Sequence, residues 1–228
     1  MRQIEKRSAV VIGAAAVLAF AGAAHAVPFN TQLLTNPGFE DPVIAGGGVE
    51  EFGPGTGWTE FGGGNFRQTS AAAGVTPNSG NQSLKMFGNP SGDFQTFAAN
   101  PGETWNGGVW MYNNSVDPIL PGQVAAVNIE WLQADLSPSA IIPFISNGTF
   151  NAGGAAPIDT WQLQTITGEA PADAAFARLT IITGAFAPED GPGGGAVWMD
   201  DAFFEKIPAP GTAGLLAIGG LAATRRRR

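Results

Sequence analysis

The chain has 228 residues, with 19 acidic and 11 basic side chains, one histidine and no cysteine. Seven basic residues and the histidine lie in the first 26 or last 22 positions, so residues 27–206 hold 18 acids and four bases, a net charge of −14. This balance excludes a nucleic-acid partner, because phosphate binding needs clustered cations. Without histidine or cysteine, residues 27–206 also lack Ser-His-Asp and Cys-His catalysis, His/Cys zinc sites and disulfides.

The first 26 residues have the three parts of a secretory signal peptide. A basic start is followed by an apolar core at residues 9–24 and by the small-x-small site Ala24-His25-Ala26. We therefore expect an exported protein, with cleavage by signal peptidase after Ala26.

Residues 27–206 read as one all-β domain. Glycine and proline interrupt short apolar or alternating runs, a pattern typical of an antiparallel β-sandwich. Alternation is clearest in residues 124–134 and 175–182, which predicts strands with one buried and one wetter face. The expected strands are 32–35, 57–61, 65–68, 82–87, 93–97, 104–112, 124–134, 140–145, 161–166, 175–182 and 195–205.

A pair of carboxylates, as in glycosidases, is the catalytic arrangement that the composition leaves open. The evident acid pairs, such as Glu50-Glu51 and Asp200-Asp201, are sequence neighbours. Neighbours on a strand point to opposite faces, which does not suit a shared cleft. We therefore expect no enzyme activity, and carboxylate-dependent glycan hydrolysis stays as an alternative.

Six motifs follow one another along this domain: Leu33-Leu-Thr-Asn-Pro-Gly-Phe-Glu40, Gly57-Trp58, Gly80-Asn-Gln-Ser-Leu84, Pro101-Gly-Glu-Thr-Trp105 with Val109-Trp-Met-Tyr112, Thr160-Trp-Gln162, and Val197-Trp-Met-Asp-Asp201. In this order they resemble the galactose-binding-like jelly rolls, and among them the carbohydrate-binding modules that accompany bacterial polysaccharide enzymes. The resemblance implies a jelly roll of two antiparallel sheets packed face to face.

The resemblance also implies a structural calcium ion where the first and last strands meet. Calcium takes several oxygen ligands from carboxylates and carbonyls. Glu40 would share the ion with Asp200 or Asp201, and only one aspartate would be a direct ligand because neighbours face opposite sides. The alternative is that Glu40 caps a turn and the aspartates are solvated charges at a strand end.

Sugar binding needs exposed aromatic rings beside hydrogen-bonding side chains, and most of the six tryptophans are expected in the core. The better platform candidates are Trp105 and Tyr112, at the two ends of one strand. On a regular strand these two residues face opposite sides and form no common surface, unless Gly107-Gly108 inserts a bulge.

The sequence of the last 22 residues predicts a short membrane stop. A Pro-Ala-Pro triplet leads into a Gly/Ala-rich apolar stretch, and the chain ends in arginines that favour the cytoplasmic side. This order resembles the PEP-CTERM sorting signal, with alanine where that family has glutamate. The resemblance implies transient inner-membrane anchoring and cutting by an exosortase-like protease. The alternatives are an ordinary tail anchor or a buried terminal helix. The motif residues are Pro208, Ala209, Pro210, Arg225, Arg226, Arg227 and Arg228.

Together these features predict three segments: a signal peptide (1–26), a β-sandwich domain (27–206) and a sorting segment (207–228). They favour an exported, non-catalytic protein of the cell surface or extracellular matrix that could associate with exopolysaccharide. The first alternative is a carbohydrate-binding module with a defined glycan ligand, and the second is the glycan hydrolase.

Overall fold

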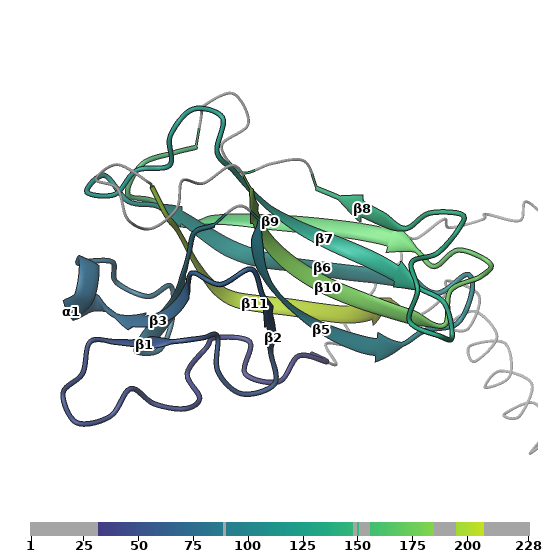
Figure 1. Cartoon of the computed structure of the whole chain (residues 1–228), viewed down its shortest axis with the longest axis horizontal. Helices are drawn as coiled ribbons and strands as arrows, with labels where there is room; N and C mark the ends of the chain where they lie inside the picture. The colour runs from purple at the N-terminus through teal and green to yellow at the C-terminus, as the bar shows by residue number, and fades with distance from the viewer. Residues whose placement is uncertain (1–31, 89, 148–149, 151–155, 185–194, 208–228) are drawn as a thin grey trace, which may run out of the picture.

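The computed structural model describes residues 32–88, 90–147, 150, 156–184 and 195–207. Over these ranges the chain forms two antiparallel sheets packed face to face (Figure 1). The predicted signal peptide and all of the sorting segment beyond Ile207 lie outside the described residues. Within the described ranges, no helix is long and apolar enough to cross a membrane.

One sheet has six strands in the order β1-β3-β4-β11-β6-β9, and each neighbouring pair is antiparallel. Its two longest strands, β6 and β11, are neighbours and span most of the length of the sandwich (Figure 1). The strands are β1 (Glu50–Phe52), β3 (Asn65–Thr69), β4 (Gln82–Met86), β6 (Thr104–Asn113), β9 (Gln162–Glu169) and β11 (Val197–Ile207).

The other sheet has five strands in the order β2-β5-β10-β7-β8, also antiparallel throughout. A single helical turn, α1 (Ser70–Ala73), follows β3 at one end of the sandwich (Figure 1). The strands are β2 (Thr59–Phe61), β5 (Ser91–Ala98), β7 (Val124–Leu132), β8 (Phe144–Ser146) and β10 (Phe176–Gly184).

The chain crosses from one sheet to the other between β2 and β3, through the turn Gly62–Gly64. All three glycines have φ between 81° and 90°, a region that side chains disfavour. A Cβ on Gly62 would clash with the carbonyl oxygen of Pro90, and one on Gly64 would lie 2.6 Å from the Phe87 carbonyl oxygen. The tight crossing therefore requires glycine at both positions.

The core lies between the sheets and follows the predicted alternation. On β7, Val127, Ile129 and Trp131 are fully buried, while Asn128 and Glu130 on the other face are half-buried. On β10 the alternating residues Ala177, Leu179 and Ile181 are buried in the same core. The structure confirms the predicted antiparallel β-sandwich of the jelly-roll type.

Local departures from the predicted strands have local causes. β1 and α1 were not expected, because three or four residues are too few to show a period. β8 begins at Phe144 instead of residue 140, because side chains occupy the preceding N–H groups: Asp173 accepts from Ala140 (2.8 Å) and Ser139 Oγ accepts from Ile141 (3.1 Å). These N–H groups cannot then join the ladder of the sheet.

Candidate functional site

The two aspartates of β11 lie at a β-bulge. Asp200 pairs with Trp110 and Phe203 pairs with Gly108, so two residues of β11 oppose the single residue between them on β6. Asp201, inside the bulge, has φ of 45°. An extra residue breaks the alternation of faces, which corrects the expectation that the two carboxylates point to opposite sides.

Both aspartates instead bind the same short segment. Asp200 Oδ2 accepts from the backbone N–H of Ser79 (3.2 Å), and Asp201 Oδ1 accepts from the Ser79 hydroxyl (2.7 Å). Asn78 donates to the other oxygen of Asp201 (2.7 Å). A Cβ on Gly38 would lie within 3.6 Å of an oxygen of each aspartate, so both carboxylates lie beside that glycine.

Glu40 approaches this point with its stem but turns its carboxylate toward the next turn. Its Cγ would lie 3.8 Å from a Cβ on Gly38, while its Oε1 accepts from the backbone N–H groups of Asn81 (2.6 Å) and Gln82 (2.9 Å). Within the described ranges, no group of three or more acidic, histidine or cysteine side chains is close enough to hold a metal ion. The structure therefore brings two of the three predicted calcium ligands together.

Electrostatics at the bulge suits a cation. Asp200 is fully buried, and burial, followed by the charge of Asp201, raises its pKa to about 8. The ion pairs of the described chain involve neither aspartate. Two convergent carboxylates without a basic partner are the kind of donor set that a hard divalent cation prefers.

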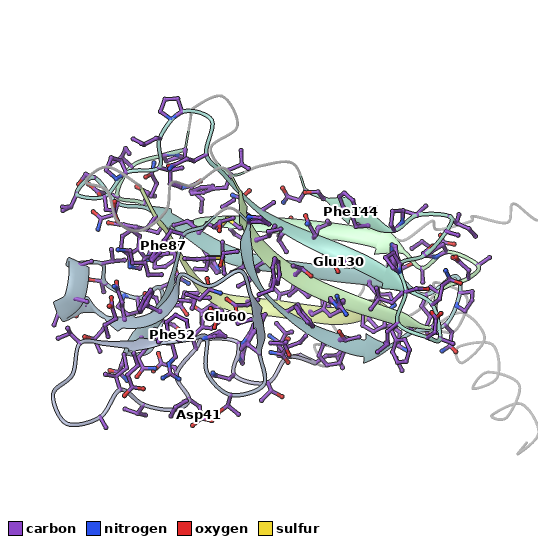
Figure 2. All side chains as sticks on the ribbon, viewed as in Figure 1. Asp41, Phe52, Glu60, Phe87, Glu130 and Phe144 are labelled. Atoms are coloured by element: carbon purple, nitrogen blue, oxygen red, sulfur yellow. The ribbon has the colours of Figure 1, made fainter. Side chains whose placement is uncertain are left out.

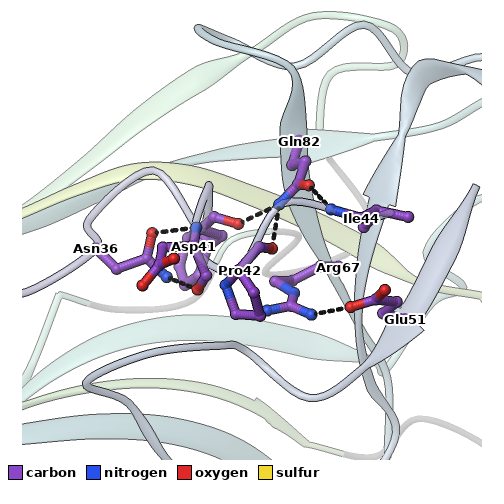
Figure 3. A network of polar contacts seen from close by, with 8 residues as sticks. Asn36, Asp41, Pro42, Ile44, Glu51, Arg67 and Gln82 are labelled. Atoms are coloured by element: carbon purple, nitrogen blue, oxygen red, sulfur yellow. Dashed lines mark hydrogen bonds and ion pairs between the residues drawn. The ribbon is translucent and has the colours of Figure 1, made fainter. Parts of the chain in front are cut away.

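The loop that carries Glu40 is fixed by Gln82. Its amide nitrogen donates to the carbonyl oxygens of Phe39 (2.8 Å) and Pro42 (3.3 Å), and its oxygen accepts from the N–H of Ile44 (2.6 Å), as Figure 3 shows for the network around Pro42. A single buried side chain thus satisfies three backbone groups of the loop, which holds Glu40 beside β11 without regular secondary structure.

Trp105 and Tyr112 lie on opposite sides of β6, as expected for a regular strand. Trp105 is 1% exposed and packs 4.9 Å from the Phe204 ring, so it is a core residue and not the predicted platform. Tyr112 is half-buried on the outer face, 5.2 Å from the Trp161 ring. The register between β6 and β9 is continuous past Gly107 and Gly108, so no bulge brings the two predicted rings together.

A row of polar and aromatic side chains crosses the outer face of the five-stranded sheet. The strand registers align Thr96 on β5, Arg178 on β10, Glu130 on β7 and Phe144 on β8; we call these four residues the Arg178 row. With strands about 4.8 Å apart, the row is about 14 Å long. Figure 2 labels its end at Glu130 and Phe144, over β7 and β8.

Arg178 organises this row. Its guanidinium lies 4.1 Å from the centre of the Phe94 ring, its Nε donates to Thr96 Oγ1 (3.0 Å), and its Nη1 donates to Glu130 Oε2 (3.2 Å). The Arg178 and Glu130 side chains are 22% and 26% exposed, and Phe144 is 55% exposed. An arginine has five N–H donors and these contacts use two, so the group is oriented while donors remain for a ligand.

The neighbouring row contains two polar atoms without a partner. Thr180 and Asn128 face each other on β10 and β7, and both Thr180 Oγ1 and Asn128 Oδ1 are buried without a hydrogen bond. Sequence reasoning missed this surface, because it depends on the registers of four strands. The alternation in residues 175–182 was the available signal, since it placed Arg178 on the wetter face.

No protein-family model matches the chain, and no curated protein matches it. Among solved structures, it is similar to the Stig cyclase FisC from Fischerella sp. TAU, in complex with a pyrrolidinylidene-indole, with a TM-score of 0.54 and 14% identity over 78% of this chain and 98% of that one. This likeness shows a shared fold alone.

Two further similar structures have lower TM-scores. TmCBM61, in complex with β-1,4-galactotriose, has a TM-score of 0.48 and 14% identity, over 77% of this chain and 98% of that one. The enzymatically active domain of tailspike protein 4 of bacteriophage CBA120 has a TM-score of 0.45 and 14% identity, over 67% of this chain. This chain matches 20% of the tailspike chain.

Proposed function

We propose that the described domain is a carbohydrate-binding module whose ligand lies across the Arg178 row. The observation that carries this proposal is the oriented Arg178, held between Phe94, Thr96 and Glu130 on a partly exposed sheet face. This favours the carbohydrate-binding alternative over a purely structural role in a matrix, which requires no such arrangement.

The chemistry of the row fits a neutral glycan. The apolar face of a sugar ring can pack on the exposed ring of Phe144, while guanidinium and carboxylate bind neighbouring hydroxyls as donor and acceptor. The guanidinium is already paired with Glu130, and the domain carries a net charge of −14. Both facts disfavour an acidic polysaccharide.

Affinity electrophoresis in gels containing neutral polysaccharides, such as β-1,4-galactan or xylan, tests the proposal. The wild-type chain should be retarded by at least one of them. Phe144→Ala and Arg178→Ala should each lose most of the retardation. Phe52→Ala is the matched control, because Phe52 is 66% exposed on an edge strand of the other sheet. Equal retardation of all the variants would refute this site.

The glycan hydrolase alternative has its own test. Incubation of the same polysaccharides with the purified chain, followed by a reducing-sugar assay, should show no release. Release that disappears in Glu130→Gln would instead make the Arg178 row a catalytic site. A domain that binds exopolysaccharide without cleaving it would serve the predicted role at the cell surface or in the extracellular matrix.

We also propose a calcium ion at the bulge, held by Asp200 and Asp201 with Glu40 nearby. The convergence of two carboxylates without a basic partner supports it. Saturating calcium should raise the melting temperature of the wild-type chain, and the rise should shrink in Asp201→Asn. An Asp201→Asn variant that gains as much from calcium as the wild type would contradict the proposed ligands.

Export and sorting are proposed from the two ends of the sequence. Signal peptidase would cut after Ala26, and an exosortase-like protease would cut near Pro208-Ala209-Pro210. Mass spectrometry of the protein recovered outside the cell should find neither residues 1–26 nor Arg225–Arg228. A recovered C-terminus that still carries the four arginines would rule out the proposed processing.

A further inference from the structure

Three polar side chains meet between the sheets, beside the crossing from β2 to β3. Glu60 on β2 lies directly opposite Asp93 on β5, and Asp93 lies opposite the core residue Ile181. Asn65 on β3 pairs with the core residue Met86 and so faces the interior from the other sheet. Asp93 and Asn65 are both fully buried, and Glu60 is labelled over β2 in Figure 2.

Most of the polar atoms in this cluster are unsatisfied. Both carboxyl oxygens of Asp93, Oε1 of Glu60 and the amide nitrogen of Asn65 are buried without a hydrogen-bond partner. The amide of Asn65 lies close enough to oppose the rise in the pKa of Asp93, but it does not reach hydrogen-bonding geometry. Buried polar groups are nearly always satisfied in folded proteins, so these atoms indicate a missing partner.

That partner is not a basic side chain. Every lysine and arginine in the described ranges pairs with another acid: Arg67 with Glu51, Lys85 with Asp117, Arg178 with Glu130, and Lys206 with Glu103. The buried carboxyl group of Asp93 thus faces the half-buried carboxyl group of Glu60 without a positive charge from the described chain. An isolated buried carboxylate is strongly disfavoured.

We propose that Asp93, Glu60 and Asn65 bind a divalent cation between the two sheets. The donors are oxygens, which suit calcium or magnesium and not a softer metal. The oxygen and nitrogen of the Asn65 amide are exchanged by a half-turn, after which the oxygen faces the carboxyl groups and the nitrogen donates to Ser91 Oγ. In the structure the Ser91 hydroxyl donates to Asn65 Oδ1 (2.8 Å). A hydroxyl group can also accept a hydrogen bond, so Ser91 can pair with the amide nitrogen after the exchange.

The site has a structural consequence. Glu60 and Asp93 belong to the five-stranded sheet, whereas Asn65 belongs to the six-stranded sheet. An ion bound by all three residues would join the sheets where the chain crosses between them. It would also hold β2, a strand of three residues that pairs with β5 alone.

The electrostatics of the cluster agrees with a missing positive charge. Without the ion, burial, followed by the charge of Glu60, raises the pKa of Asp93 to about 8, and burial raises the pKa of Glu60. The other groups that face Asp93 are Ile181 from β10 and Asn65 from β3; Arg67, two residues along β3, is paired with Glu51. A cation at this point would supply the positive charge that the described chain does not.

The test is isothermal titration of the purified full chain, stripped with chelator, with calcium alone and then magnesium alone. All variants carry Asp200→Asn, which disables the proposed calcium site at the bulge. Binding in this background therefore reports on the Asp93 site alone, whether or not the bulge site binds calcium. In this background, one cation per chain should bind at pH 7. Adding Asp93→Asn, which keeps the shape and removes the charge, should abolish that binding.

Two comparisons keep the result decisive. Adding Asp135→Asn to the same background is the matched control and should leave the binding unchanged, because Asp135 is an exposed residue of a turn. Circular dichroism should show that the Asp93→Asn variant is folded; if it is not, Glu60→Gln in the same background should weaken binding at least tenfold. If neither cation binds in the Asp200→Asn background, or if Asp93→Asn leaves binding intact, the proposal is wrong.

Discussion

Asp200 and Asp93 are both fully buried, both have another acid beside them, and burial raises the pKa of each to about 8. They differ in their hydrogen bonds. Asp200 accepts from the backbone N–H groups of Ser79 (3.2 Å) and Asp201 (2.7 Å), whereas Asp93 accepts none. The same raised pKa therefore describes one carboxyl group that is hydrogen-bonded to the backbone and another that has no hydrogen-bond partner.

Removal of the two carboxyl groups should therefore have opposite consequences for stability. A buried acceptor that satisfies N–H groups stabilises the fold in either protonation state, and its loss leaves those donors unpaired. A buried carboxylate without partners destabilises the fold until it takes up a proton or binds a cation. Stability measurements in chelator can separate the two cases.

The largest effect is expected from Asp200→Ala. The substitution leaves the N–H groups of Ser79 and Asp201 without their acceptor. The free energy of unfolding at pH 6 should therefore fall by about 3 kcal/mol. Urea denaturation in chelator measures the change. Asp159→Ala is the matched control: exposed Asp159 also accepts two hydrogen bonds, from Ser115 and Tyr112, and water can replace it as the acceptor, so its loss should destabilise the fold far less than Asp200→Ala does.

The next effect is a fall in stability with rising pH. The pKa values of Asp93 and Asp200 rise from 3.8 to about 8 on folding, so the folded chain keeps protons that the unfolded chain loses. The stability is full below about pH 4 and declines as the pH rises through 8. Melting temperatures in chelator should fall steadily from pH 5 to pH 8. A flat profile would show that the pKa values of the two carboxyl groups do not change on folding.

Asp93→Asn should flatten part of that profile. The amide carries no charge, so the variant in chelator should match the wild type near pH 5 and exceed its melting temperature at pH 8. A variant that loses stability at both pH values would show that the Asp93 carboxylate already has a stabilising partner, which would erase the difference from Asp200.

Glu60→Gln should give the smallest change. The charge of Glu60 is the second cause of the raised pKa of Asp93, after burial. Removing that charge should lower the pKa of Asp93 and raise the melting temperature at pH 8 by less than Asp93→Asn does. An equal or larger gain would mean that the charge of Glu60, and not burial, dominates the shift.

The sequence predicted most strands and, through the resemblance, named Asp200 and Asp201, but it predicted neither the bulge that brings these two aspartates to Ser79 nor the cluster at Asp93. Alternation and glycine-rich turns revealed the strands because those signals are local. The bulge at Asp200 adds one residue without changing composition, so the alternating pattern gave no sign that both aspartates would bind Ser79. Glu60 and Asp93 are 33 positions apart and meet through a pairing that depends on the crossing at Gly62–Gly64.

The same limit applies to the candidate binding surfaces. Placing Trp105 and Tyr112 on opposite faces of β6 needed only the period of one strand. Choosing the buried face needed the packing of the whole sandwich, and so Trp105 was mistaken for a platform. The Arg178 row joins four strands whose order is not their order in sequence, and no local pattern shows it.

The backbone N–H of Leu33 donates to the carbonyl oxygen of Phe204 (3.0 Å), so the two ends of the described chain leave the sandwich side by side. The pairing is antiparallel, since Ala202 in turn donates to Pro37 (2.9 Å). Tension applied between these ends would peel residues 33–37 from β11 one hydrogen bond at a time. The domain should therefore yield to a small pulling force from this end, whereas a load along the axes of the long strands β6 and β11 would strain many of their hydrogen bonds at once.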